Sequence, residues 1–211
     1  MATKVFISFR FKDGKEIKDE LVSLFDESTE VINRSEDKDR NRMSDETIQN
    51  YLYEKLKDTS VTILLLTPEA VSYEKDWYGK YDDWLYDELR YSLEDRTNNR
   101  TNGVVAVYTD DARDKLFTED THYCSCCRQN QTCRMLKDFD NLARKNMLNI
   151  KPKFKKNSCN NLYSDEYDSY ISLVSLEVFK QDYKKYIDNA KEKRDRIEEF
   201  NIIKRMKDYI N

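Results

Sequence analysis

The chain has 211 residues and a net charge of −4, from 37 basic and 41 acidic side chains. This length suits one domain with a hydrophobic core plus an appendage, and the acidic balance argues against a nucleic-acid partner. The longest apolar run, residues 61–66, is far shorter than the ~20 residues of a membrane helix, and no signal-peptide pattern opens the chain. We therefore expect a cytoplasmic protein without a membrane or nucleic-acid partner.

Glycine is scarce, with three residues in all, and neither the G-x-G-x-x-G nor the P-loop pattern occurs. A nucleotide site in this chain would therefore depend on side chains and helix N-termini rather than on a glycine-rich loop.

Five short β-branched or aromatic runs predict the strands of a sheet. Residues 61–66 (VTILLL) and 104–108 (VVAVY) are apolar throughout, which is typical of strands buried on both faces of a parallel sheet. The other three runs cover residues 4–9, 30–33 and 170–174.

Amphipathic patterns between these runs predict helices at 16–25, 45–56 and 82–95, with Ser44 as a candidate N-cap of the second. A long, highly charged helix is predicted over 179–209, where no proline or glycine interrupts the chain.

Strands that alternate with helices predict a mainly parallel five-stranded sheet with helices on both faces. The expected strand order is the flavodoxin-like 2-1-3-4-5, and ligands of such sheets bind at the carboxyl ends of the strands where the order reverses. The sequence therefore predicts a site just after Phe9 and Leu66.

A long insertion at about 110–169 breaks the alternation, and within it we expect one helix near 134–146. It carries the only histidine and all five cysteines of the chain. Thiolates and imidazole at short spacing suit a structural zinc ion, although the Cys124-x-x-Cys127 pair has no second C-x-x-C to match it. The alternative is a loop of reduced thiols without metal, since disulfides are disfavoured in the cytoplasm. The candidate ligands are His122, Cys124, Cys127 and Cys133, with Cys126 and Cys159 nearby in sequence.

Three sequence segments in order resemble a TIR domain: VFISFRFKD (5–13), SDETIQNYLYEKLKDTSVTILLLTPEAV (44–71) and WLYDEL (84–89). Within that superfamily the chain is most similar to the bacterial TIR-like group of Thoeris anti-phage systems, the ThsB family. Residues 171–194 also resemble the end of that group's domain.

The resemblance implies a single TIR-like domain over 1–211, with the insertion at about 110–169 and the C-terminal helix at about 179–209. It also implies cleavage of NAD and release of a signalling nucleotide, either a cyclic ADP-ribose isomer or an ADP-ribose conjugate, which activates a separate effector. The charged segment 34–45 matches the TIR loop that gates the site and mediates self-association, which implies a homo-oligomer; a solvated loop is the alternative.

The same resemblance implies that Glu88 is the catalytic carboxylate, with Trp84 one helical turn before it. Cleavage of the nicotinamide–ribose bond passes through an oxocarbenium-like ribosyl cation, which a carboxylate stabilises. Nicotinamide leaves without being protonated, so a second carboxylic acid is not required. The alternative interpretation is a solvated glutamate on an amphipathic helix.

Substrate-binding candidates surround the end of the first strand: Ser8, Phe9, Arg10 and Asp13, together with Trp84. An aromatic ring can stack on nicotinamide or adenine, and the Arg10 guanidinium can hold the diphosphate. The alternatives are a core phenylalanine, a surface arginine and a turn aspartate.

Two other functions compete with the enzyme. A TIR domain that acts only as a protein-interaction scaffold has no need of a carboxylate behind Trp84. A phosphorelay receiver domain needs acidic residues at the end of the first strand and an aspartate at the end of the third. The chain has Ser8-Phe9 and Leu66-Thr67 there, which excludes the receiver.

Overall fold

The computed structural model describes most of the chain, and every structural statement below concerns the described residues. They are residues 2–26, 31–33, 45–95, 100–156 and 162–207.

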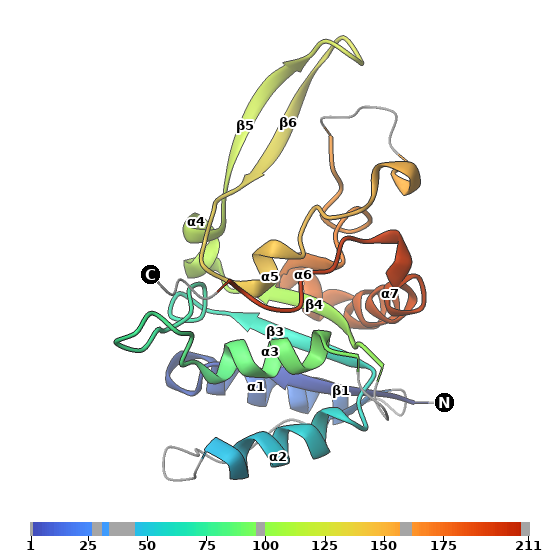
Figure 1. The fold of residues 1–211 in the computed structure, drawn as a ribbon. Helices are drawn as coiled ribbons and strands as arrows, with labels where there is room; N and C mark the ends of the chain where they lie inside the picture. The colour runs from blue at the N-terminus through green and yellow to red at the C-terminus, as the bar shows by residue number, and fades with distance from the viewer. Residues whose placement is uncertain (1, 27–30, 34–44, 96–99, 157–161, 208–211) are drawn as a thin grey trace.

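A five-stranded sheet forms the centre of the molecule, in the order β2-β1-β3-β4-β7 (Figure 1). Each pair of neighbours is parallel, so the flavodoxin-like order expected from the sequence is confirmed. The central β3 and β4 are buried along their whole length, as their apolar sequences predict. The strands are β1 (Thr3–Ser8), β2 (Val31–Asn33), β3 (Val61–Leu66), β4 (Gly103–Tyr108) and β7 (Ile171–Ser175).

Two hydrophobic clusters cover the two faces of the sheet, because successive strand side chains point in opposite directions. Ile63 and Leu65 pack with α1, α6 and α7, whereas Leu64 and Leu66 pack with α3 and with the insertion. The helices are α1 (Phe11–Asp26), α2 (Asp45–Leu56), α3 (Trp84–Leu93), α6 (Leu176–Gln181) and α7 (Tyr183–Asp195).

The contact of α7 with β4 is close enough to require glycine at the start of that strand. A Cβ atom added to Gly103 would lie 2.0 Å from the carbonyl oxygen of Ala190. Gly103 therefore allows α7 to pack directly on the sheet.

The prediction of one long helix over 179–209 is wrong. The chain instead forms α6, α7, a 3₁₀ turn η3 (Ile197–Glu199) and an extended segment that continues to residue 207. Asp182 ends α6 and caps α7, since its side chain accepts a hydrogen bond from the Lys185 backbone N–H. Beyond η3, Phe200 is buried against Tyr170. This contact favours an extended backbone at this place rather than continuation of the helix.

The insertion also differs from its prediction. The expected helix near 134–146 is wrong, because residues up to Leu136 form a strand and only Leu142–Lys145 are helical. Asn141 caps that single turn, and its side chain also donates to the carbonyls of Ala70 and Val71, which locks the turn to the body. The insertion elements are η1 (Asp110–Ala112), α4 (Arg113–Leu116), β5 (Phe117–Cys124), β6 (Gln129–Leu136), α5 (Leu142–Lys145) and η2 (Pro152–Phe154).

Strands β5 and β6 pair with each other in a separate antiparallel hairpin. Figure 1 shows this hairpin projecting away from the body of the molecule, with its turn at the far end. Except for the buried Phe117 at its base, the side chains of β5 are mostly exposed.

Candidate active site

The site lies at the carboxyl end of the sheet, where β1 is followed by α1 and where the segment after β3 leads into α3. Ser8 is the last residue of β1 and is fully buried. Its hydroxyl donates a hydrogen bond to Oε2 of Glu88, with 2.6 Å between the two oxygens. Two candidates that are 80 residues apart in sequence are therefore in direct contact.

Helix α3 holds Glu88 in position through its first turn and its buried face. Asp83 is the N-cap, and its Oδ1 accepts a hydrogen bond from the Leu85 backbone N–H at 2.9 Å. Leu85 and Leu89 anchor the helix in the core. Glu88 therefore projects, half-buried, from a helix whose start and face are both fixed.

Arg10 is bound by two carboxylates of the segment that joins β3 to α3. Its guanidinium donates to Glu74 at 2.7 Å and also to the buried Asp83. The backbone N–H of Glu74 donates to the same Asp83 carboxylate at 2.8 Å. The Nε of Arg10 is buried and has no hydrogen-bond partner among the described residues. Arg10 thus fixes the path of this segment and keeps one donor for a ligand.

Two further buried polar atoms lack partners at the same end of the sheet. Asp13, in the first turn of α1, accepts from the Glu69 backbone N–H through Oδ2, while its Oδ1 is unpartnered within the described chain. The hydroxyl of Thr67, directly after β3, is likewise unpartnered there. Because buried polar atoms are normally hydrogen-bonded, these atoms favour a polar ligand at this place.

Three aromatic side chains lie just after β1 or at the start of α3. The rings of Phe9 and Phe11 stack with centroids 5.8 Å apart, and Gly14 lets the first turn of α1 pass close to Phe9. Trp84 lies one turn before Glu88 and is 39% exposed. Phe9 packs with the hydrophobic cluster on the α1 face of the sheet, whereas Trp84 is on the same helix as Glu88, where its partly exposed ring suits a ligand with a planar ring system.

The zinc candidates lie on the hairpin and not with Glu88. The β5–β6 register pairs Asp120 with Cys133, His122 with Gln131 and Cys124 with Gln129. His122, Cys124 and Cys133 therefore share one face of the hairpin. The thiol of Cys127 accepts from Gln131 at 3.7 Å, which directs it toward the same face.

These side chains are nevertheless spread along the strands. No group of three potential ligands close enough to hold a metal ion occurs in the part of the chain that the structure describes. Cys159 lies outside the described residues, as do Ser44 and the segment 34–44 that resembles the TIR gating loop.

Three residues of the site are not predicted from the sequence: Asp83 and Glu74, which bind Arg10, and Thr67. A signal for Asp83 was available, because aspartate before an amphipathic run is a preferred N-cap. Because the helix was predicted to begin at residue 82, Asp83 was treated as part of the helix and not as its N-cap. Glu74 had no comparable local signal.

Comparison with known families agrees with this geometry. Residues 6–114 match the family model described as Thoeris protein ThsB, TIR-like domain. The chain belongs to this family. The match covers just over half the chain, from β1 into α4, and includes Ser8, Asp83 and Glu88.

Membership of the ThsB family assigns the chain to Thoeris anti-phage defence. The hairpin, β7 and the C-terminal helices lie beyond the matched residues. Within the described ranges, no helix has the length and apolarity needed to cross a bilayer.

Proposed function

We propose that this ThsB-family protein cleaves NAD and releases a signalling ADP-ribose derivative. The observation that carries the proposal is the hydrogen bond between Ser8 and Glu88 at the carboxyl end of the sheet. It holds a half-buried carboxylate at the end of the sheet where Arg10, Asp13 and Thr67 have polar atoms without partners among the described residues. Together with the partly exposed Trp84 one turn earlier on α3, this suits a dinucleotide whose ribose must be stabilised as a cation.

The reaction breaks the bond between the nicotinamide nitrogen and C1′ of the ribose. The electron pair leaves with nicotinamide and neutralises its ring, and positive charge develops at C1′. Glu88 stabilises this charge as a carboxylate, while Ser8 orients it by donating to one of its oxygens. A nucleophile then forms a bond to C1′ and loses its proton, and the identity of that nucleophile sets the product.

Binding of NAD uses the other predicted residues. Trp84 offers a partly exposed ring for the nicotinamide or the adenine, and Phe9, which packs against the cluster on the α1 face, offers a half-buried one. In this proposal the Nε–H of Arg10 donates to the diphosphate and the Oδ1 of Asp13 accepts from a ribose hydroxyl, since neither atom has a partner among the described residues.

The product in this proposal is a cyclic ADP-ribose isomer or an ADP-ribose conjugate, which reaches a separate effector by diffusion. NAD is available in the cytoplasm, where we place the protein, and self-association through segment 34–45 would regulate it. A structural zinc in the insertion is a further part of the proposal.

A non-catalytic scaffold is the second candidate, and one observation favours it. Trp77 and Tyr78 are 96% and 78% exposed at the tip of the segment between β3 and α3. The Asp76 side chain holds that tip by accepting from the backbone N–H groups of Tyr78 and Lys80. Exposed aromatics on an ordered turn are typical of protein contact sites.

NAD turnover separates the two functions. Glu88→Gln keeps the shape of the side chain and removes its charge, so we expect NAD cleavage to fall by at least about a hundredfold, the scale of losing one transition-state contact. The measurement is release of nicotinamide and nucleotide products by mass spectrometry, with and without infected-cell extract.

Glu54→Gln is the matched control, since Glu54 is an exposed glutamate of α2 whose carboxylate lies 3.9 Å from the ammonium of Lys57. Circular dichroism checks that both variants are folded. Full turnover by the folded Glu88→Gln protein would show that another group is catalytic. Wild-type protein that releases no nicotinamide under either condition would favour the scaffold.

A further inference from the structure

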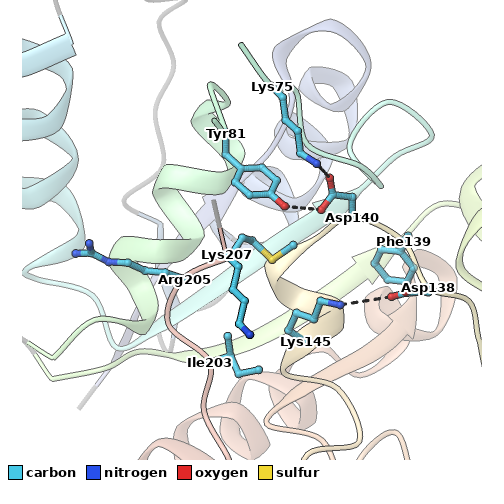
Figure 2. A pocket seen from close by; sticks show the side chains of 10 residues that line it. Lys75, Tyr81, Asp138, Phe139, Asp140, Lys145, Ile203, Arg205 and Lys207 are labelled. Atoms are coloured by element: carbon cyan, nitrogen blue, oxygen red, sulfur yellow. Dashed lines mark hydrogen bonds and ion pairs between the residues drawn. The ribbon is translucent and has the colours of Figure 1, made fainter. Parts of the chain in front are cut away.

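A cavity separate from the Ser8–Glu88 site opens between three segments that are distant in sequence. Its volume is about 670 Å³, within the range of small-molecule sites. The segment between β3 and α3, the residues around α5, and the extended C-terminal segment each form one wall (Figure 2). Two of these walls lie outside the part of the chain that matches the ThsB family model.

One wall is ordered by a network around Asp140. Its carboxylate accepts from Lys75 at 2.7 Å and from the Tyr81 hydroxyl at 2.8 Å. The Lys75 ammonium also lies 4.8 Å from the centre of the Tyr81 ring. With Phe139, Ile203 and Met206 also lining the cavity, Tyr81 contributes to an aromatic and apolar surface.

The opposite side of the cavity is positively charged. Figure 2 shows the ammonium ends of Lys145 and Lys207 on the same side of the cavity, whereas Arg205 points away. Arg205 is bound to Glu94 at 2.8 Å. Lys145 has a longer ion pair of 3.5 Å with Asp138, whose side chain is 83% exposed. Two ammonium groups thus face one weakly held carboxylate, which favours an anionic ligand.

We propose that this cavity binds a nucleotide, with its phosphates between Lys145 and Lys207 and its base against Tyr81 and Phe139. Inorganic phosphate alone would leave most of the volume and the aromatic wall unused. A planar base supplies the missing apolar contact by stacking.

The cavity and the candidate active site share one segment of chain. Glu74 and Asp83 bind Arg10, and Lys75 and Tyr81, which lie close to them in sequence, line the cavity and pair with each other in a β-bridge. A nucleotide that moves Tyr81 or draws Lys75 from Asp140 would therefore change the position of Arg10. This regulatory consequence rests on the proposed function, whereas the binding itself does not.

Tryptophan fluorescence tests the binding directly. The two tryptophans of the chain are Trp77, on the shared segment, and Trp84, at its end. ADP and inorganic pyrophosphate are titrated against the full-length protein, and we expect a saturable change with ADP at lower concentration than with pyrophosphate. Pyrophosphate that binds as tightly as ADP would overturn the proposed base contact.

Single substitutions locate the signal. Lys145→Gln and Lys207→Gln should each raise the Kd for ADP about tenfold, the scale of a charged hydrogen bond. Asp138→Asn removes the competing carboxylate and should lower the Kd. Lys191→Gln is the control, because Lys191 is exposed on α7 and does not line the cavity. Equal Kd values in all four variants and the wild type would overturn the proposal.

The proposed active site also accommodates nucleotides, so Glu88→Gln is included. If Lys145→Gln weakens ADP binding in both the wild-type and the Glu88→Gln background, the ADP binds in the cavity. This conclusion holds whether or not the protein cleaves NAD. Failure of NAD cleavage with this pattern intact would refute the proposed function and leave the cavity site standing.

Discussion

Lys193 is a buried cation on α7, only 3% exposed. Its ammonium donates a hydrogen bond to the Ser172 hydroxyl on β7. Burial lowers the pKa of Lys193 to about 7, while Glu166 and Asp168 act to raise it and Arg196 acts to lower it. A lysine with this pKa is charged in the unfolded chain and largely neutral in the folded chain above neutral pH.

The stability of the protein should therefore rise with pH above neutrality. Below about pH 7 both states carry the proton and the full cost of the buried charge applies. Between that value and the ordinary lysine pKa the unfolded state binds more protons, so the free energy of unfolding increases by up to about 1.4 kcal/mol per pH unit. Urea unfolding at pH 6, 7.5 and 9 measures this slope.

Lys193→Met removes the titrating group and should flatten the slope, while raising stability at pH 6. Lys191→Met, an exposed neighbour on α7, should leave the slope unchanged. A slope that persists in Lys193→Met would assign the pH dependence to another group.

Arg10 illustrates how far residue types alone could predict the candidate site. Ser8 was expected at the end of the first strand, and Glu88 was assigned through the resemblance to TIR domains; the hydrogen bond between them was not predicted. The expectation that Arg10 would hold a diphosphate did not include Asp83 and Glu74, which engage two of its nitrogens. Those partners depend on the path of the segment after β3, for which no periodic pattern exists.

The β5–β6 hairpin lies outside the residues that match the ThsB family model. A two-stranded hairpin in water is marginally stable without further support. At its base Phe117 is buried, and Arg134 lies 4.3 Å from the centre of the Phe117 ring. At its far end the turn is closed by a hydrogen bond from the Arg128 N–H to the Cys124 carbonyl. Cys124 and Cys127 belong to this closed turn.

The zinc hypothesis for this hairpin predicts about one equivalent of zinc per chain and a lower melting temperature with a chelator. Cys133 pairs with Asp120, four positions along β5 from Cys124 and so about 13 Å away. A zinc ion at the turn would therefore exclude Cys133 unless the hairpin distorts. Double substitution of Cys124 and Cys127 by serine should abolish zinc binding, whereas Cys126→Ser should not. Protein purified without chelator that contains no zinc would refute the hypothesis.

At the scale of the whole molecule, the C-terminal segment belongs to the same core as the sheet. Phe200 is 3% exposed and packs on Tyr170. The side-chain amide of Asn146 donates to the carbonyl of Ile203 and accepts from its backbone N–H. Phe200, Ile202 and Met206 of this segment pack in the hydrophobic core of their own chain. We therefore propose that 1–211 is one TIR-like domain, insertion included.

Shortening the chain should accordingly unfold it. Truncation after Ile187 removes Ala190, which packs on Gly103, and also Phe200, so we expect no cooperative unfolding transition in the product. Phe200→Ala in the full chain should cost about 3 to 5 kcal/mol, measured by urea unfolding. Ile203→Ala, at a position 42% exposed, is the milder control. A folded truncated protein would show that the segment is an appendage, and light scattering would then test whether it pairs subunits.

The sequence by itself determined the sheet and the place where its strand order reverses. Apolar strands, amphipathic helices and their alternation are local patterns, and a right-handed parallel arrangement of them leaves few topologies. The observed strand order follows from these patterns.

Only the tertiary structure decided the rest. Contacts between residues far apart in sequence decide where α7 ends and how the chain continues to Phe200, as the pairing of Ile150 with Phe200 shows. Similar contacts, such as that of Phe117 with Leu136, form a hairpin where a helix was expected. Local helix propensity is a fraction of a kcal/mol per residue. Burial of one large aromatic side chain, at roughly 1.5 to 3 kcal/mol, outweighs it.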